Sequence, residues 1–345
     1  MLQISSIIKL VSMKHVLGCL LLLVLCVSCS TGSKTDKYQG KRKNVIDVNS
    51  KVKEIRMDDV LIGSYARLFV MGDYLIIGDY KSSDRLVRIF DKNTFQYLTS
   101  VANIGQGPGE ITVMGHIGID EKNRTFYVTD HGKMKIFSYE LDSVLSRSDY
   151  QPKVKAEITM KQFPDRYYYM SDTLSLALTI VPGRSSFEQC VARWNMADGT
   201  FEPMPYEHPD IERKRICMAV SPDLNEYVEC YLYHDLMTVC DMEGNLKCNV
   251  YGPAWNSKMS NKVRHYGNVV FCRDKIIASY SGNDNFSEDA TPTVLLAFSK
   301  DGDYLKTLDV GRKIMDLCYD KDNNRLIMCL NDEYQFAYLD LNEFF

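Results

Sequence analysis

The sequence predicts an all-β fold, a six-bladed β-propeller that is closed by a strand from the N-terminal side of the domain. Three observations lead to this prediction: a unit of four short strands recurs along the chain, tight turns stand at matching places in the units, and the repeat length fits. Residues 66–345 divide into six units of about 47 residues, between the periods of WD40 and kelch repeats.

The first unit sets the pattern. Its four strands are expected at 67–71, 74–80, 86–91 and 95–101, and the loop 105–110 follows them. The next four units span 113–160, 167–204, 215–251 and 268–310.

The sixth unit, 314–341, has only three expected strands. We therefore expect residues 52–57, which precede the first unit and otherwise lack a partner, to supply its fourth strand. Closing the ring in this way removes the exposed strand edges that an open array of sheets would carry.

Turns between the third and fourth strands support the repeat. They read Asp91-Lys92-Asn93, Ala197-Asp198-Gly199, Glu243-Gly244-Asn245 and Asp301-Gly302-Asp303. Asp, Asn and Gly supply the positive φ that tight hairpins require. The Asp-rich segment 320–324 lacks the full twelve-residue calcium-loop pattern, so turn chemistry accounts for it better than calcium binding.

Composition excludes one class of function. The chain has 41 basic and 45 acidic residues, a net charge of −4. Proteins that bind duplex nucleic acid present a broad basic surface, so no nucleic-acid partner is expected. The 22 Tyr and 14 Phe agree with a strand-rich fold.

The N-terminus has the features of a lipoprotein signal. A short apolar run, 16–27, follows Lys9 and Lys14, and it is too short to span a membrane, which takes about twenty residues. It ends in Cys26-Val27-Ser28-Cys29-Ser30, which resembles a bacterial lipobox with Cys29 as the lipidated residue. We therefore predict a signal peptide at 1–28, a polar tether at 29–50 and the propeller at 51–345.

A family resemblance rests on three features: this lipobox-like end, the loop Gly105-Gln106-Gly107-Pro108-Gly109-Glu110, and the strand pair around 119–121 and 126–130. Together they resemble the TolB-like six-bladed β-propeller lipoproteins of Gram-negative bacteria. The resemblance implies the fold and a cell-envelope location with an outer-membrane anchor. It carries over no catalytic residues.

The glycine-rich loop is not expected to bind phosphate. A dinucleotide-binding loop lies between a strand and a helix, whereas here Pro108 interrupts the loop and a strand-like segment, 111–119, follows it. Its expected role is the sharp passage from one blade to the next, for which glycines suit.

Loop lengths predict where a partner binds. The long connections 103–112, 205–214, 252–266 and 281–292 all fall on one rim, whereas 140–153 is the one long connection on the other. Binding residues concentrate on loops that a rigid scaffold holds. The candidates on the long-loop rim are Glu207, His208, Arg213, Trp255, Arg264, His265 and Phe286.

The central channel supplies a second candidate site. The inner strands are mostly apolar, and the polar exceptions are Arg67, His116, Asn268 and Asp316. These residues either hold a small ligand or metal, or are polar core groups satisfied by their neighbours, and the second interpretation is favoured.

Cysteine use and the absence of catalytic motifs complete the prediction. The eight cysteines of the domain lie mostly in apolar strands, as small buried residues, so free thiols are favoured over pairs such as Cys217 with Cys230.

The favoured function is a membrane-anchored binding or scaffolding propeller that presents its long-loop rim to an envelope protein or a glycan, without a cofactor. The alternative is a hydrolase of a lactone, ester or glycan with Ca or Zn in the channel, and a third possibility is a purely structural envelope component.

Overall fold

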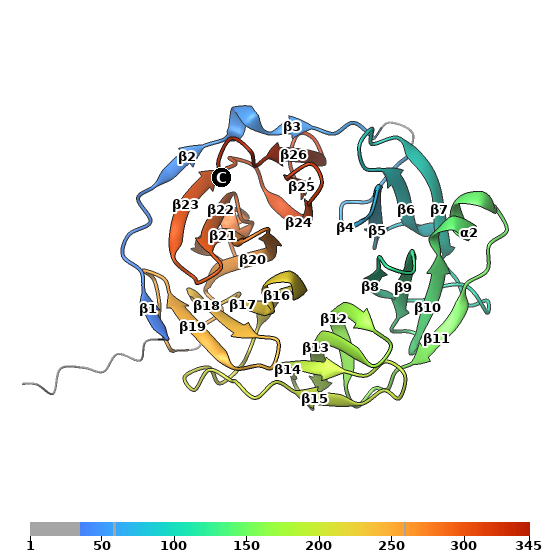
Figure 1. Cartoon of the computed structure of the whole chain (residues 1–345), viewed down its shortest axis with the longest axis horizontal. Helices are drawn as coiled ribbons and strands as arrows, with labels where there is room; N and C mark the ends of the chain where they lie inside the picture. The colour runs from blue at the N-terminus through green and yellow to red at the C-terminus, as the bar shows by residue number, and fades with distance from the viewer. Residues whose placement is uncertain (1–34, 58–59, 259) are drawn as a thin grey trace, which may run out of the picture. The chain divides into compact units, whose positions relative to one another are not determined.

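The fold is known from a computed structural model that describes residues 35–57, 60–258 and 260–345. The chain divides into two units, Met1–Asp36 and Lys37–Phe345, and the second contains the propeller. Six sheets are arranged in a ring around a central channel, each with its first strand innermost (Figure 1). The predicted six-bladed propeller is confirmed.

Each of the first three blades is a four-stranded antiparallel sheet. The first contains β4 (Ala66–Met71), β5 (Tyr74–Asp79), β6 (Arg85–Asp91) and β7 (Tyr97–Asn103). The second contains β8 (Met114–Asp120), β9 (Thr125–Asp130), β10 (Lys135–Glu140) and β11 (Lys153–Glu157). The third contains β12 (Phe163–Ser171), β13 (Leu174–Pro182), β14 (Phe187–Trp194) and β15 (Phe201–Pro203).

The last three blades each gain an outer strand from the N-terminal segment. Blade four contains β16 (Ile216–Ser221), β17 (Glu226–Tyr231), β18 (Leu236–Asp241) and β19 (Leu246–Tyr251), with β1 (Asp36–Tyr38) outside. Blade five contains β20 (Val263–Cys272), β21 (Lys275–Asp284), β22 (Val294–Ser299) and β23 (Tyr304–Asp309), with β2 (Val45–Asp47) outside. Blade six contains β24 (Ile314–Asp320), β25 (Arg325–Leu330) and β26 (Phe336–Asp340), with β3 (Lys53–Glu54) outside.

The ring closes where the sequence predicts, through a shorter strand. β3 is antiparallel to β26, with Glu54 opposite Ala337 and Lys53 opposite Tyr338. The Ile55 amide adds a hydrogen bond of 2.9 Å to the Phe336 carbonyl. Two residues of 52–57 therefore form the strand, and Ile55 extends the pairing into the hydrophobic core.

The predicted tether, 29–50, differs from the structure over its described part. From Lys37 onward the segment lies along the outer edges of blades four and five, as Figure 1 shows. β2 runs parallel to β23, with Ile46 opposite Leu308, and Val48 is fully buried. Apolar burial and strand pairing thus hold this segment on the propeller, although its many cations had led us to predict a solvated tether. Cys29 and the rest of 1–34 lie outside the described residues.

The hydrophobic core lies between the blades. Its six clusters each combine side chains from two neighbouring sheets, and one of them joins blade six to blade one through Ile327, Phe336, Leu68 and Ile77. Because both faces of a blade are covered, the middle strands β9, β17 and β25 are buried at every residue. Aliphatic burial contributes about 25 cal/mol per Å², so each interface between blades stabilises the ring.

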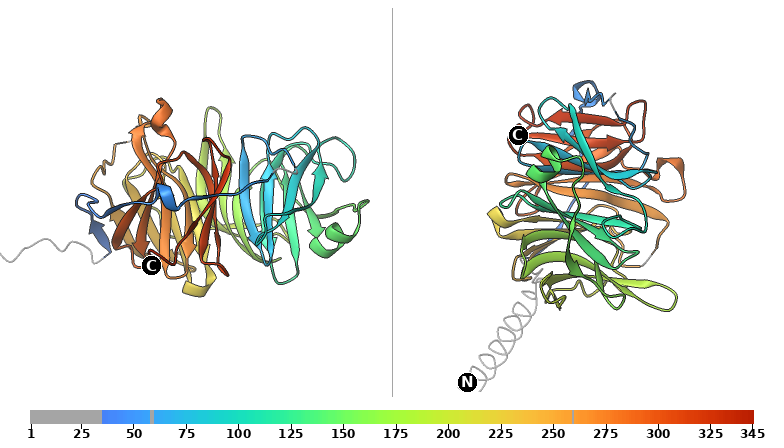
Figure 2. Two further views of the ribbon diagram at one scale, coloured as in Figure 1. Left: turned by 90° about the horizontal axis from the view of Figure 1, so that it is seen from above. Right: turned by 90° about the vertical axis from the view of Figure 1, so that its right-hand side faces the viewer.

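The two rims differ as predicted. The first-to-second and third-to-fourth connections lie on one rim, which we call the turn rim. The second-to-third and blade-to-blade connections lie on the other, the loop rim. The short helix α2 (Leu141–Ser146) fills the long exception on the turn rim. Figure 2 shows η3 (Glu288–Ala290) projecting from the loop rim and η2 (Pro222–Leu224) from the turn rim; a third 3₁₀ turn, η1 (Asn49–Lys51), precedes β3.

Candidate functional site

The four predicted channel residues occupy one level of the propeller. Arg67, His116, Asn268 and Asp316 are each the fourth residue before the last residue of an innermost strand, β4, β8, β20 and β24. These strands run from the loop rim toward the turn rim, so the four side chains start from equivalent positions around the channel.

Three of these side chains bond to the backbone of the next blade. Nε2 of His116 lies 2.9 Å from the carbonyl of Tyr167. Nδ2 of Asn268 donates to the carbonyl of Met315 at 2.9 Å, and Oδ2 of Asp316 accepts from the amide of Leu68 at 2.7 Å. These three hydrogen bonds link neighbouring blades at the channel, while Nδ1 of His116 is buried with no partner among the described residues.

The same level includes two residues that sequence reasoning missed. Cys217 is the fourth residue before the end of β16. Arg166 is one residue further from the end of β12, where a bulge between Tyr169 and Ser171 inserts an extra residue. Nη1 of Arg166 donates to Oδ1 of Asn268 at 3.2 Å, from blade three to blade five. Counting back four residues from the first turn of each blade would have identified Cys217, whereas the bulge moves Arg166 out of that count.

Two tyrosines fix the position of Arg67. Its guanidinium lies 5.0 Å from the ring centroid of Tyr80 and 5.8 Å from that of Tyr65, and Nη2 donates to Oη of Tyr65 at 3.1 Å. Oη of Tyr80 in turn donates to the carbonyl of Gly115 at 2.6 Å. Cation–π contact thus holds the guanidinium against the aromatic faces.

Burial and the two arginines set the ionisation of this level. Burial lowers the pKa of His116 well below its ordinary value, and Arg67 and Arg166 lower it further. Burial raises the pKa of Asp316, while Arg166, the Leu68 amide and Arg67 oppose the shift. Burial also raises the pKa of Tyr80 to about 12. At neutral pH the histidine and tyrosine are therefore neutral.

The channel side chains do not fit the calcium or zinc site of the hydrolase alternative. Such a site needs several carboxylate, imidazole or thiolate ligands. Among the described residues, no three His, Cys, Asp or Glu side chains gather closely enough to hold a metal ion. The channel level instead holds two guanidinium groups and one carboxylate, and this excess of positive charge disfavours a cation.

The loop-rim candidates are mostly not at the surface. His208 and His265 are buried, with ring nitrogens 3.0 Å from Oη of Tyr251 and 3.2 Å from Oη of Tyr280. Trp255 is half-buried and its ring centroid lies 4.9 Å from that of Tyr251. Arg264 is half-buried with its Nε atom enclosed.

Arg213, by contrast, is exposed at a cavity of about 270 Å³ on the loop rim. Glu207 and Phe286 are also exposed, and Glu207 lines the same cavity. The cavity lies between the β13–β14 connection and the passage from blade three to blade four. At its edge the guanidinium of Arg215 stacks on Phe187 with 3.8 Å to the ring centroid.

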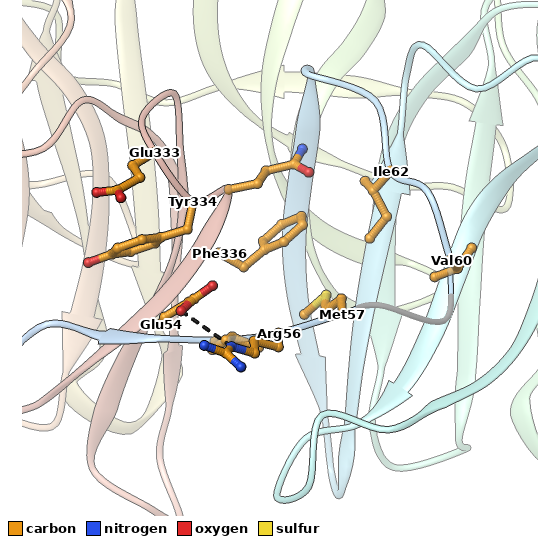
Figure 3. A pocket seen from close by; sticks show the side chains of 10 residues that line it. Glu54, Arg56, Met57, Val60, Ile62, Glu333, Tyr334 and Phe336 are labelled. Carbon is orange, nitrogen blue, oxygen red and sulfur yellow. Dashed lines mark hydrogen bonds and ion pairs between the residues drawn. The ribbon is translucent and has the colours of Figure 1, made fainter.

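A second loop-rim cavity of about 200 Å³ lies where the closing strand leads into blade one. Figure 3 shows its lining, with Tyr334 and Phe336 on one side and Val60 and Ile62 on the other, and the ion pair between Glu54 and Arg56. Both cavities therefore lie on the rim with the longer loops.

Exposed apolar side chains gather on the same rim. Of the thirteen large hydrophobic side chains that are exposed in the described part of the chain, seven lie there: Leu61, Tyr65, Ile104, Val113, Met160, Phe187 and Phe286. One of the thirteen, Leu174, lies at the turn rim, and the other five lie on outer strands or in the channel. The loop rim is thus the more apolar of the two end faces.

Comparison with known proteins identifies the fold family. Residues 53–235 match the model of DUF5128, described as a 6-bladed beta-propeller. No curated protein matches the sequence. Within the described residues, no helix has the length and apolar character needed to cross a membrane.

Solved structures share the fold at low sequence identity. A member of the DUF4221 family from Bacteroides vulgatus has a TM-score of 0.57 at 10% identity, covering 83% of this chain and 94% of that one. A protein described as exported, from Bacteroides fragilis, has a TM-score of 0.54 at 9% identity, covering 86% and 88%. The extracellular domain of a one-component system from B. thetaiotaomicron has a TM-score of 0.51 at 10% identity, covering 82% of this chain and 35% of that one.

Proposed function

Because the chain belongs to the DUF5128 family of 6-bladed beta-propellers, we propose that it is a binding module of the cell envelope whose loop rim docks a protein partner. The observation that carries this proposal is that seven of the thirteen exposed large hydrophobic side chains in the described part of the chain lie on the loop rim. Exposed apolar surface that is concentrated on one face often marks an interaction site.

A protein partner is favoured over a glycan by the kind of side chains on this face. Leu61, Ile104, Val113 and Met160 are aliphatic, and an apolar centre with polar surroundings is typical of protein interfaces. Arg213 and Glu207, at the nearby cavity, provide charged groups for the border of such a contact. Residues buried among aromatic neighbours, such as His208 and His265, act as support for the loops.

The proposed cell-envelope location is supported by the exported and extracellular character of structural neighbours together with the lipobox-like sequence that ends at Ser30. We propose that Cys29 carries a lipid and that this lipid anchors the domain in the outer membrane, as the resemblance to TolB-like lipoproteins implies. Cys29→Ala should release the protein from membranes into the soluble fraction. Release of wild-type protein to the same degree would contradict the anchor.

The docking face is tested with two matched triple variants. Each variant and the wild type are cross-linked to their neighbours in intact envelopes, and the captured proteins are compared. The first changes Leu61, Val113 and Met160 on the loop rim to Ser, and the second changes Leu98, Val154 and Leu174 elsewhere to Ser. All six side chains are exposed, so both variants should fold. We expect a partner that the wild type and the second variant capture and the first does not.

Equal capture by the two variants would place the contact elsewhere. Binding of the wild type to purified envelope glycans, lost in the loop-rim variant alone, would keep the face and change the class of partner.

A further inference from the structure

Two guanidinium groups in the channel have no carboxylate partner. In the described residues, the hydrogen-bond acceptors of the guanidinium groups are the Tyr65 hydroxyl for Arg67 and the Asn268 amide oxygen for Arg166. Neither forms an ion pair within that part of the chain. Both side chains are half-buried, at the level where the loop-rim halves of the innermost strands surround the channel.

Three more deeply buried cations of this protein are paired with carboxylates. Arg42 lies 2.8 Å from Asp235, Lys214 lies 3.0 Å from Glu229, and Arg325 lies 2.9 Å from Asp320. Removing a charge from water without a partner is costly. Arg67 and Arg166 therefore keep a donor capacity that the fold itself does not use.

Both guanidinium groups are held in place before any ligand arrives. The ring centroids of Tyr65 and Tyr80 lie 5.8 and 5.0 Å from the guanidinium carbon of Arg67. A guanidinium has five N–H donors, of which the hydroxyl of Tyr65 accepts one. Asn268, which accepts from Arg166, is itself fixed by its bond to the Met315 carbonyl. Donors with restricted freedom lose less entropy when they bind.

The two cations act on the same small region. Both affect the ionisation of His116, Tyr80 and Asp316. Because the histidine and the tyrosine are neutral at neutral pH, two positive charges face one negative charge at this level. The excess is positive, in a protein whose overall charge is −4.

We propose that the loop-rim half of the channel binds an oxyanion group, a carboxylate or a sulfate, with Arg67 and Arg166 as its donors. Planar forked donors match the two oxygens of such groups. The ligand enters from the loop rim, because both arginines start near the loop-rim ends of β4 and β12. This site shares Tyr65 with the loop rim, but the proposal does not rest on the docking of a partner there.

The test uses three sugars that differ only in the group at carbon 6: glucuronate carries a carboxylate there, glucose 6-sulfate a sulfate ester, and glucose a neutral hydroxymethyl group. Each is titrated calorimetrically into the purified full-length protein. We expect one equivalent of at least one acidic sugar to bind, more weakly as salt increases, and glucose not to bind. The preference between the two acids then identifies the oxyanion.

Variants with opposite expected effects on affinity show whether the two arginines bind the oxyanion. Arg166→Gln and Arg67→Gln should each weaken binding about tenfold or more, as expected for loss of hydrogen bonds to a charged group. Asp316→Asn should tighten binding, because it removes the negative charge that competes for the arginines. Arg147→Gln, an exposed change beside α2 at a residue that pairs with Asp149, is the matched control and should bind as the wild type.

Two results would overturn the proposal. One is that neither acid binds better than glucose at tens of millimolar. The other is that Arg166→Gln and Arg67→Gln bind the acid as tightly as the wild type. If an Arg→Gln variant fails to fold, Asp316→Asn decides alone: tighter binding supports the site and unchanged or weaker binding rejects it.

Discussion

Nζ of Lys92 lies 3.2 Å from Oδ1 of Asp320, and both side chains are almost fully enclosed. Lys92 belongs to the turn after β6 in blade one, whereas Asp320 ends β24 in blade six, so the pair joins the first and last blades at the turn rim. The Asp316–Leu68 hydrogen bond joins the same two blades at the channel. With β3 on the outside, the closure of the ring is therefore supported at three places.

We expect Lys92→Met to lower the free energy of unfolding by about 3 kcal/mol, the low end for breaking a buried pair. Arg325 remains 2.9 Å from the same carboxylate and limits the loss. Denaturant unfolding measures the change. Lys321→Met is the matched control, since its pair with Asp223 is exposed on both sides, and it should change stability by less than about 0.5 kcal/mol. Equal losses in the two variants would show that closure does not depend on the buried pair.

The N-terminal segment depends on a second buried pair. Asp235 is fully buried and accepts from Nη2 of Arg42 at 2.8 Å and from the amide of Ala254 at 3.1 Å. Arg42→Met leaves that carboxylate without a cation, and we expect a loss of about 3–5 kcal/mol in the free energy of unfolding.

Lys51→Met is the control for this variant, because Lys51 pairs with Glu343 where both side chains are about half exposed. It should cost less than about 0.5 kcal/mol. Limited trypsin digestion gives a second measurement: cleavage after the exposed Lys41 and Lys43 should become faster in Arg42→Met. An unchanged digestion rate would indicate that strand pairing alone holds the segment.

The sequence predicted the blades well because their signals are local. Strand alternation, Asp- and Gly-containing turns and the missing strand of the sixth unit can all be recognised within about fifty residues. Arg166 was missed for a local reason as well: Pro164 and Asp165 interrupt the apolar pattern, so the start of β12 resembled a loop.

Other errors arise from partners that are distant in sequence. Val45 has its strand partner at Thr307, and no short window of sequence contains both. His208 and His265 stand in polar loops, yet Tyr251 and Tyr280 cover them. A histidine in a long loop thus does not distinguish a surface ligand from a residue that supports the loop.

Thiol labelling tests the prediction that the cysteines are unpaired. Seven of the eight cysteines in the described residues are buried and Cys190 is partly exposed, all as free thiols. Burial also raises the pKa of Cys272 and Cys318, which makes them less reactive. Of these eight cysteines, iodoacetamide should therefore label Cys190 alone in the native protein, as peptide mass mapping would show.

Unfolding without a reductant should then expose all eight thiols to the reagent. Cys217 and Cys230 are the informative pair, because they stand opposite each other in β16 and β17. If these two remain unlabelled until a reductant is added, they form a cross-strand disulfide in the isolated protein.

Stability should fall on mild acidification because His116 stays neutral in the folded protein. Its pKa is lowered by burial and by Arg67 and Arg166, whereas an unfolded histidine takes up a proton near pH 6.5. Between pH 7.5 and 5.5 the unfolded state therefore gains a proton that the folded state does not, which lowers the free energy of unfolding by about 1.4 kcal/mol. His116→Gln keeps a donor for the Tyr167 carbonyl and cannot titrate, so its loss of unfolding free energy over this interval should be smaller than that of the wild type by that amount.

Burial also lowers the pKa of His131 and His265, so some loss of unfolding free energy should persist in the variant. Denaturant unfolding of both proteins at the two pH values measures the difference, and parallel losses would mean that His116 is protonated within the fold.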